Sequence, residues 1–473
     1  MIRVAVQLSK TTAAVVRTAG LGSSSRFDLL SSPSSSWLAS PLRSLHVGID
    51  RPNASPVTCQ MINYALSHAR SQKSDESYAQ GRLVLEQCLS AQSSEGQDAD
   101  NSRGAVLLAM STLFAERGDI HDAIDKLQRV EDLAHCSLDI RVAALEALAG
   151  LHLELNLDDS SSDIADKCLK LFENSKVADD GNSGVLRARV KAVKGLVELV
   201  KNNLDAAASL FEGFQTIERC AGSAAFAYGE FLVASQNFSS AKEVYQRVIE
   251  VGSEVQDLSE QCALAGGNMS PMEVLVAATC ALGQLEGHLG NFSEAEDILT
   301  NALTKAEAYF GSHHPKVGVV LTCIALMYRY KAKKEHSSSL LIQEGLYRRA
   351  MDLMKVSPKG TGEQVKVDRC DIANIAGGAY AEILDVQKNR KAEGQMMRKW
   401  SELAWKNRRI SLEEAYLICN IFEFWLLCIF IEDKRVSTFS RLTMLCNLLM
   451  KYKNLKNVEF SDTVEMSILQ LQF

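Results

Sequence analysis

Small residues recur along this chain at regular intervals, and this recurrence limits the folds open to it. Three consecutive intervals of 42 residues are followed by one of 34. The recurring positions are Gly81, Ala123, Ala165, Ala207, Ala241, Ala295, Gln343, where the residue is not small, and Ala392. A large residue stands four positions after each of them, on the same face of a helix. We therefore expect a repeated helical unit that buries its apolar face by stacking against its neighbours.

Residues 275–303 are the most regular copy of this unit and read as two antiparallel helices joined at Gly290-Asn291. Asn291 is expected to end the first helix in the left-handed conformation. Ser293 and Glu296 have the spacing of a capping box, which would start the second helix. The same kind of turn is expected at the other copies.

Small side chains are predicted wherever the two helices of a unit approach closely. Some belong to the first helix of a unit and others to the second. The residues assigned to this packing are Ala123, Gly195, Ala207, Gly229, Ala241, Gly283, Ala295 and Ala302.

The composition favours helices over strands. The 473 residues include only 7 prolines and 28 glycines, and signals for β-hairpins are nearly absent. We therefore predict an all-α fold, with the repeats covering residues 57–408.

The pattern resembles the tetratricopeptide-repeat superfamily, in which the 34-residue period is typical. Residues 311–317, GSHHPKV, follow an A-x-x-x-L-x-x-A helix and are similar to the repeats of kinesin light chains. The resemblance implies a right-handed superhelical solenoid of about eight antiparallel helix pairs. The adjacent His313 and His314 are expected to cap or pack a turn between repeats rather than to bind a metal ion.

Residues 1–49 differ from the rest of the chain and are predicted to be a disordered transit peptide. Arg3, Lys10 and Arg17 share one helical face, serines are frequent, and the segment holds a single acidic residue. The segment around Arg43 resembles plant mitochondrial processing sites. We expect a mitochondrial location, with a chloroplast or cytoplasmic location as the alternatives.

Residues 409–473 form an atypical tail in which the repeat pattern stops. Its apolar run, 417–431, contains Asn420 and Glu423, and a membrane-spanning helix needs about 20 apolar residues. Three interpretations stay open: a buried capping helix, a membrane anchor, and translation of an intron or a shifted reading frame. The membrane anchor is the least favoured of the three.

The chain shows no signal for catalysis, for a cofactor or for nucleic acid. Its net charge of -7 disfavours general binding to nucleic acid, which needs a basic surface. The 12 cysteines are scattered without zinc spacing, and no nucleophile elbow, phosphate loop or dinucleotide fingerprint is present. We expect a protein that is not an enzyme and that holds no cofactor or metal.

The resemblance implies a concave groove that is lined by the first helix of each pair and binds peptides. Polar or large residues at these positions are the candidate groove residues, and for any one of them ordinary packing between repeats is the favoured alternative. They are Arg189, Phe226, Glu230, Gln284 and Arg329. The Lys and Asn pattern that binds chaperone carboxylates does not occur at these positions.

The sequence therefore predicts a non-catalytic scaffold or adaptor that binds one or more protein partners, in mitochondria. A cytosolic cargo adaptor like the kinesin light chains is one alternative, although no heptad segment precedes the repeats. A regulatory subunit of an enzyme complex is another alternative.

Overall fold

The computed structural model describes residues 54–405 and Leu412, with gaps at 92–95, 156, 176–180, 202, 215–221, 255–270, 355–369 and 388. The predicted transit peptide, 1–49, and the apolar run, 417–431, lie outside these residues. No helix among the described residues is long and apolar enough to cross a membrane.

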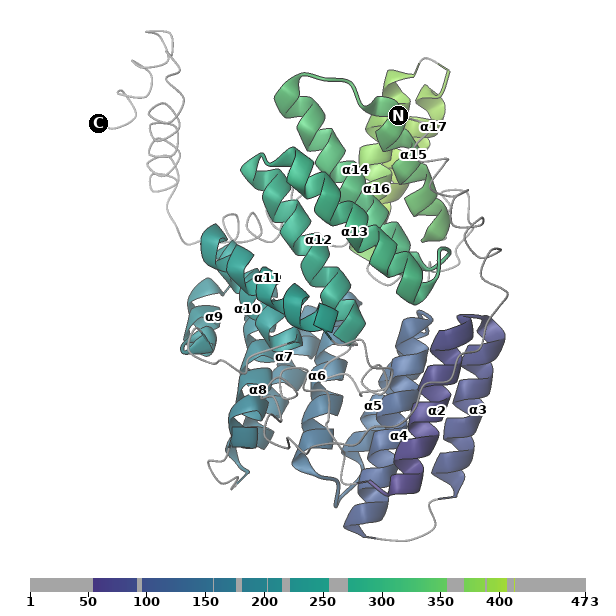
Figure 1. Ribbon diagram of the computed structural model, residues 1–473, viewed down its shortest axis with the longest axis vertical. Coiled ribbons are helices and arrows are strands. Elements are labelled where there is room, and N and C mark those ends of the chain that lie inside the picture. Colours follow the sequence, from purple (N-terminus) through teal and green to yellow (C-terminus); the bar gives the residue numbers. More distant parts are fainter. Residues whose placement is uncertain are drawn as a thin grey trace, which may run out of the picture. The chain divides into compact units, whose positions relative to one another are not determined.

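All regular elements of the described chain are helices, and they form eight consecutive hairpins (Figure 1). The first four hairpins are α2 (Pro56–Gln72) with α3 (Asp75–Ser90), α4 (Gln97–Glu116) with α5 (Ile120–Glu131), α6 (Leu138–Glu154) with α7 (Asp158–Glu173), and α8 (Gly181–Val200) with α9 (Leu204–Phe211). The last four are α10 (Ser223–Ala234) with α11 (Phe238–Glu254), α12 (Pro271–Leu289) with α13 (Phe292–Phe310), α14 (Pro315–Glu335) with α15 (Leu340–Leu353), and α16 (Cys370–Val386) with α17 (Lys391–Ala404). The predicted all-α fold of about eight helix pairs is confirmed. The right-handed superhelix stays a prediction.

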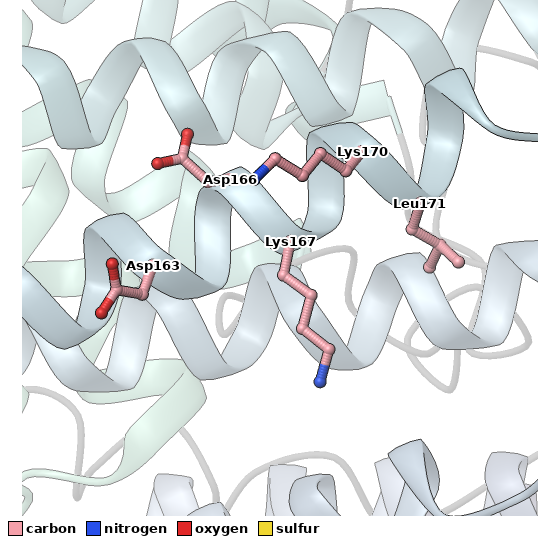
Figure 2. A pocket seen from close by; sticks show the side chains of 5 residues that line it. All are labelled: Asp163, Asp166, Lys167, Lys170 and Leu171. Atoms are coloured by element: carbon pink, nitrogen blue, oxygen red, sulfur yellow. The ribbon is translucent and has the colours of Figure 1, made fainter.

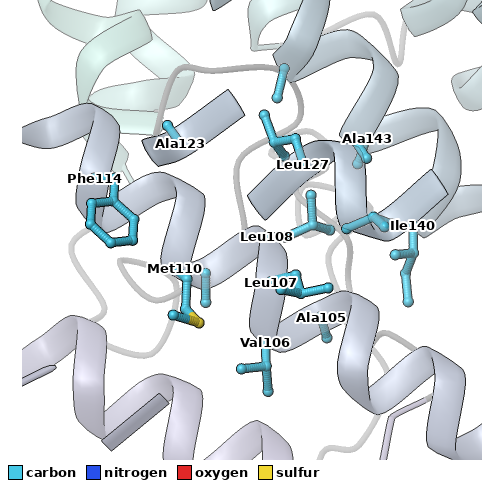
Figure 3. Packing of buried hydrophobic residues seen from close by; sticks show 14 of the residues in the cluster. Ala105, Val106, Leu107, Leu108, Met110, Phe114, Ala123, Leu127, Ile140 and Ala143 are labelled. Atoms are coloured by element: carbon cyan, nitrogen blue, oxygen red, sulfur yellow. The ribbon is translucent and has the colours of Figure 1, made fainter. Parts of the chain in front are cut away.

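The first and second helices of the hairpins are buried differently. Every residue of α6 from Val142 to Ala149 is buried, whereas α5 buries one stripe and exposes its other side. A helix that is apolar all round must be covered on all sides, and an amphipathic helix needs a single covered face. Figure 3 shows how side chains of α4, α5 and α6, among them Leu108, Leu127 and Ile140, interlock in one cluster. Among the first helices α6 is thus covered on all sides, whereas α2 at the start of the array buries one stripe only.

Close approach of paired helices depends on glycines of the first helices. A Cβ atom added to Gly195 or Gly229 would lie 2.5 Å from a ring carbon of Phe211 or Tyr245, respectively. One added to Gly283 would lie 2.7 Å from Leu299 Cγ. The alanines assigned to the same packing are all inaccessible to solvent: Ala123, Ala207, Ala241, Ala295 and Ala302. The large residue of one helix thus fills the space that a missing side chain leaves on the other.

Five of the eight turns inside the hairpins share one hydrogen bond, in which the residue before the second helix donates its N–H to a carbonyl five residues earlier. The donors are Asp119, Leu157, Asn203, Asn237 and Asn291. In the best-formed repeat Gly290, with φ +91°, takes the left-handed conformation, and not Asn291 as predicted. The predicted capping box is wrong as well, because the helix already begins at Phe292, before Ser293. Glu296 instead accepts a 2.6 Å hydrogen bond from the Tyr328 hydroxyl.

The eighth hairpin follows a different register from the one predicted. Ala392 and Met396 are exposed, whereas Gly394 and Met397 are buried. A Cβ atom on Gly394 would lie 3.0 Å from the Ala381 carbonyl oxygen, so this glycine occupies the close contact. The contact residue of α17 thus lies two positions later than the predicted spacing places it.

Candidate binding site on the first helices

Two of the predicted groove residues, Arg189 and Arg329, form ion pairs with residues of neighbouring first helices. The Arg189 guanidinium pairs with the Glu146 carboxylate of α6, and both side chains are buried. Arg329 of α14 pairs with Glu382 of α16 at 2.5 Å. These ion pairs hold consecutive repeats together, so the structure gives both arginines a packing role.

Phe226 and Glu230 lie one turn apart on α10, and both are half-buried. The ring of Phe226 lies 6.0 Å from that of Tyr245, measured between ring centroids. The Tyr245 hydroxyl donates a 2.9 Å hydrogen bond to Glu230 Oε1. Burial, followed by the neighbouring Glu230 charge, raises the pKa of Tyr245 well above its ordinary value, so this hydroxyl stays a donor.

Gln284 of α12 combines burial with an unused donor. The residue is 5% exposed, and its Nε2 atom has no hydrogen-bond partner. A buried amide without a partner costs about 1–3 kcal/mol, so most buried amides in folded proteins are paired. A ligand that supplies a hydrogen-bond acceptor to this donor would remove that cost, and the difference would add to the free energy of binding.

Glu230 and Gln284 occupy equivalent places in consecutive repeats. Glu230 directly follows the contact residue Gly229, and Gln284 directly follows Gly283. The helices that carry them, α10 and α12, are in contact. The structure thus places Phe226, Glu230 and Gln284 on neighbouring first helices. Arg189 and Arg329, in contrast, form ion pairs between repeats.

Two cavities lie away from Phe226, Glu230 and Gln284. One, of about 430 Å³, is lined by residues of α7 (Figure 2). Of these, Asp166 forms an ion pair with Lys194, and Lys167 forms one with Glu131. The other, of about 530 Å³, lies between α9 and α10, where the rings of Phe211 and Phe231 stack at 5.1 Å. Neither cavity contains a set of groups suited to catalysis.

Within the described residues no group of three or more His, Cys, Asp or Glu side chains is placed to hold a metal ion. Six cysteines whose side chains the structure describes are free thiols: Cys59, Cys88, Cys136, Cys168, Cys280 and Cys323. Burial, followed by the nearby Asp100 charge, raises the pKa of Cys136 to about 11, which keeps this thiol protonated and unreactive.

His314 caps the start of α14, as predicted for one of the two adjacent histidines. Its Nδ1 atom accepts a 3.1 Å hydrogen bond from the Lys316 backbone N–H. Its Nε2 atom donates to the Glu116 carbonyl oxygen at 2.7 Å. The sequence contains no signal for this second bond, because its partner lies 198 residues earlier.

Acid is expected to weaken the fold through His314. Burial lowers the pKa of this imidazole from its ordinary 6.5 to about 4, so the unfolded chain binds its proton more readily than the folded chain does. The contribution to stability is complete above pH 6.5 and is lost as the pH falls towards 4. Between about pH 7 and about pH 5 the free energy of unfolding should fall by about 2 kcal/mol more in the natural chain than in His314→Gln. Equal pH dependence of the two proteins in urea titrations would contradict this assignment.

Comparison with models of protein families and with curated protein sequences gives no match. Among solved structures 42 chains match. A Rap protein, crystallised in complex with competence and sporulation factor, is 11% identical, with 79% of this chain and 96% of that chain covered and a TM-score of 0.42. BtubC (BKLC) from P. vanneervenii is 12% identical, with 61% of this chain and 88% of that chain covered and a TM-score of 0.27. At these values neither likeness bears on what this chain binds. The eight hairpins themselves define the class: the chain is a helical-repeat protein.

Proposed function

We propose that this chain is a non-catalytic scaffold that binds a protein partner along the first helices α10 and α12. The observation that carries the proposal is Gln284, whose buried amide has a donor without a partner. Phe226 and Glu230, both half-buried, add an aromatic face and a carboxylate on the neighbouring helix. A peptide segment that offers a backbone carbonyl to Gln284 and an apolar side chain to Phe226 would suit these groups.

The test of this proposal is the variant Gln284→Leu, which removes the donor and keeps a side chain of similar size. Peptide ligands are first selected on the immobilised full chain from a random library, and their affinities are then measured by calorimetry. Gln284→Leu should weaken binding about tenfold and also raise the free energy of unfolding by about 1 kcal/mol, because an unpaired buried donor is removed. Leu171→Ala, in the cavity on α7, is the control and should leave affinity unchanged.

Two results would contradict the proposal. One is a selected peptide whose affinity is the same for Gln284→Leu and for the natural chain. The other is a loss of stability in Gln284→Leu, which would show that the amide is paired and belongs to the packing.

We further propose a mitochondrial location, on the basis of the basic, serine-rich residues 1–49. A fluorescent reporter fused to residues 1–50 should enter mitochondria. The matched control replaces Arg3, Lys10 and Arg17 by glutamine and should stay outside. A reporter that is diffuse in the cytosol, or that enters chloroplasts, would reject the compartment and leave the binding proposal untouched.

A further inference from the structure

The turn between α13 and α14 contacts the ends of the first two hairpins. His314 Nε2 donates to the Glu116 carbonyl oxygen at 2.7 Å, and both residues are buried. The Lys73 ammonium donates to the Ala308 carbonyl oxygen. A Cβ atom added to Gly311 would lie 4.0 Å from Lys73 Cβ. Two hydrogen bonds and one close approach thus join the end of α13 and the start of α14 to the ends of α2 and α4.

The acceptor side of this contact is held in place by buried side chains. Glu116 Oε1 accepts from Arg70 Nη2 at 2.7 Å, and Oε2 accepts from the Tyr78 hydroxyl at 2.9 Å. All three residues are buried. Because the carboxylate is fixed by helices α2 and α3, the backbone carbonyl of the same residue is presented in a defined direction at the end of α4.

The donor side is held in place as well. The His314 ring stacks on Phe310, with centroids 4.9 Å apart and an interplanar angle of 22°. Its Nδ1 atom accepts from Lys316, which fixes the tautomer that carries the proton on Nε2. The charged groups that act on the ring are Lys316, Glu273 and Arg117. The Glu116 carbonyl and the His314 ring are therefore each oriented by neighbours on their own side of this contact.

The contact is polar, and the apolar cores on its two sides are separate. One buried cluster of the described residues runs from Ile62 to Val190, and another runs from Val276 to Leu412. Neither includes side chains of both sides. Each hydrogen bond contributes about 0.5–1.5 kcal/mol net, so the two that cross this contact contribute about 1–3 kcal/mol together. The contact can therefore form and break while each core stays intact.

We propose that this contact is a reversible latch, with His314 as its central residue. In the latched state the first two hairpins are held against the turn between α13 and α14. In the unlatched state the hairpins stay folded and the connection between them runs only along the chain. The latch does not depend on which partner the repeats bind.

A disulfide trap measures the latched state directly. In Lys73→Cys/Gly311→Cys the distance between the two Cβ atoms, 4.0 Å, lies within the range of a disulfide, which is about 3.5–4.5 Å. Gly311 has φ +94°, so its new side chain is strained, and the trapping rates are compared only among variants that share this pair of cysteines. The bond should form in the folded chain with oxidised glutathione, and peptide mapping distinguishes it from bonds of the native cysteines. Adding His314→Ala should slow its formation about tenfold, whereas adding His313→Ala, at the exposed neighbouring histidine, should not change the rate. His314→Gln, which retains a donor, should recover most of the rate.

Hydrogen exchange supplies a measurement that needs no added cysteine. In His314→Ala the amides of residues 70–78 and 112–117 should exchange faster than in His313→Ala. The proposal is overturned if the 73–311 bond does not form in the folded double variant and His314→Ala leaves the exchange of residues 70–78 and 112–117 unchanged. It is also overturned if His314→Ala and His313→Ala give equal trapping rates or equal exchange.

Discussion

The variant Gly229→Ala is expected to lose about 3 kcal/mol of unfolding free energy, the upper end of the usual range for an overpacked core. The added Cβ atom would lie 2.5 Å from Cε1 of Tyr245, whose side chain is inaccessible to solvent. The ring cannot turn aside without losing the hydrogen bond from its hydroxyl to Glu230. Urea denaturation followed by circular dichroism measures the loss.

The matched control for this prediction is Gly345→Ala on α15, where an added Cβ atom meets nothing within 4 Å. Alanine is the better helix former by about 1 kcal/mol, so this variant should be as stable as the natural chain or more stable. Equal effects of the two substitutions would show that α10 and α11 do not approach as closely as described.

The variant Arg189→Ala is expected to cost about 3–5 kcal/mol, because it leaves the buried carboxylate of Glu146 without its partner. Lys167→Ala is the control: its ion pair with Glu131 lies at the surface and should contribute less than about 1 kcal/mol. Thermal and urea denaturation of both variants provide the measurement.

The double variant Arg189→Met/Glu146→Met separates packing from binding. An apolar pair of similar volume often replaces a buried ion pair at little cost, so the double variant should recover most of the stability that Arg189→Ala loses. If Arg189 belongs to the packing alone, affinity for a selected peptide should also return. Recovered stability with lost affinity would place Arg189 in the binding surface instead.

The repeat architecture could be predicted because its determinants are local. Gly283 and Leu299 lie 16 positions apart in one hairpin, and their size difference is readable from the sequence. Turn details were harder to predict, since Gly290 and Asn291 both tolerate the left-handed conformation and only the hydrogen-bond geometry separates them. The register of α17 failed for a related reason: Ala392 and Gly394 are both small, and the sequence does not rank them.

The roles of the groove candidates could not be predicted from the sequence. In the sequence, Arg189 and Gln284 are both polar residues on the predicted first helix of a repeat, and nothing in the repeat pattern distinguishes them. They differ because Arg189 has a partner in Glu146, 43 positions earlier, whereas the Gln284 donor has none. The contact of His314 with Glu116 depends on how distant hairpins meet, which no local pattern encodes.

The most direct test of the proposed binding surface is a hydrogen-exchange footprint of the full chain with a selected peptide bound. The proposal predicts that protection appears in α10 around Phe226–Glu230 and in α12 around Gln284. Helix α7, with Asp163 and Leu171, should show none. Protection confined to α7, or absent from both α10 and α12 at saturating peptide, would contradict the claim that the first helices bind the partner.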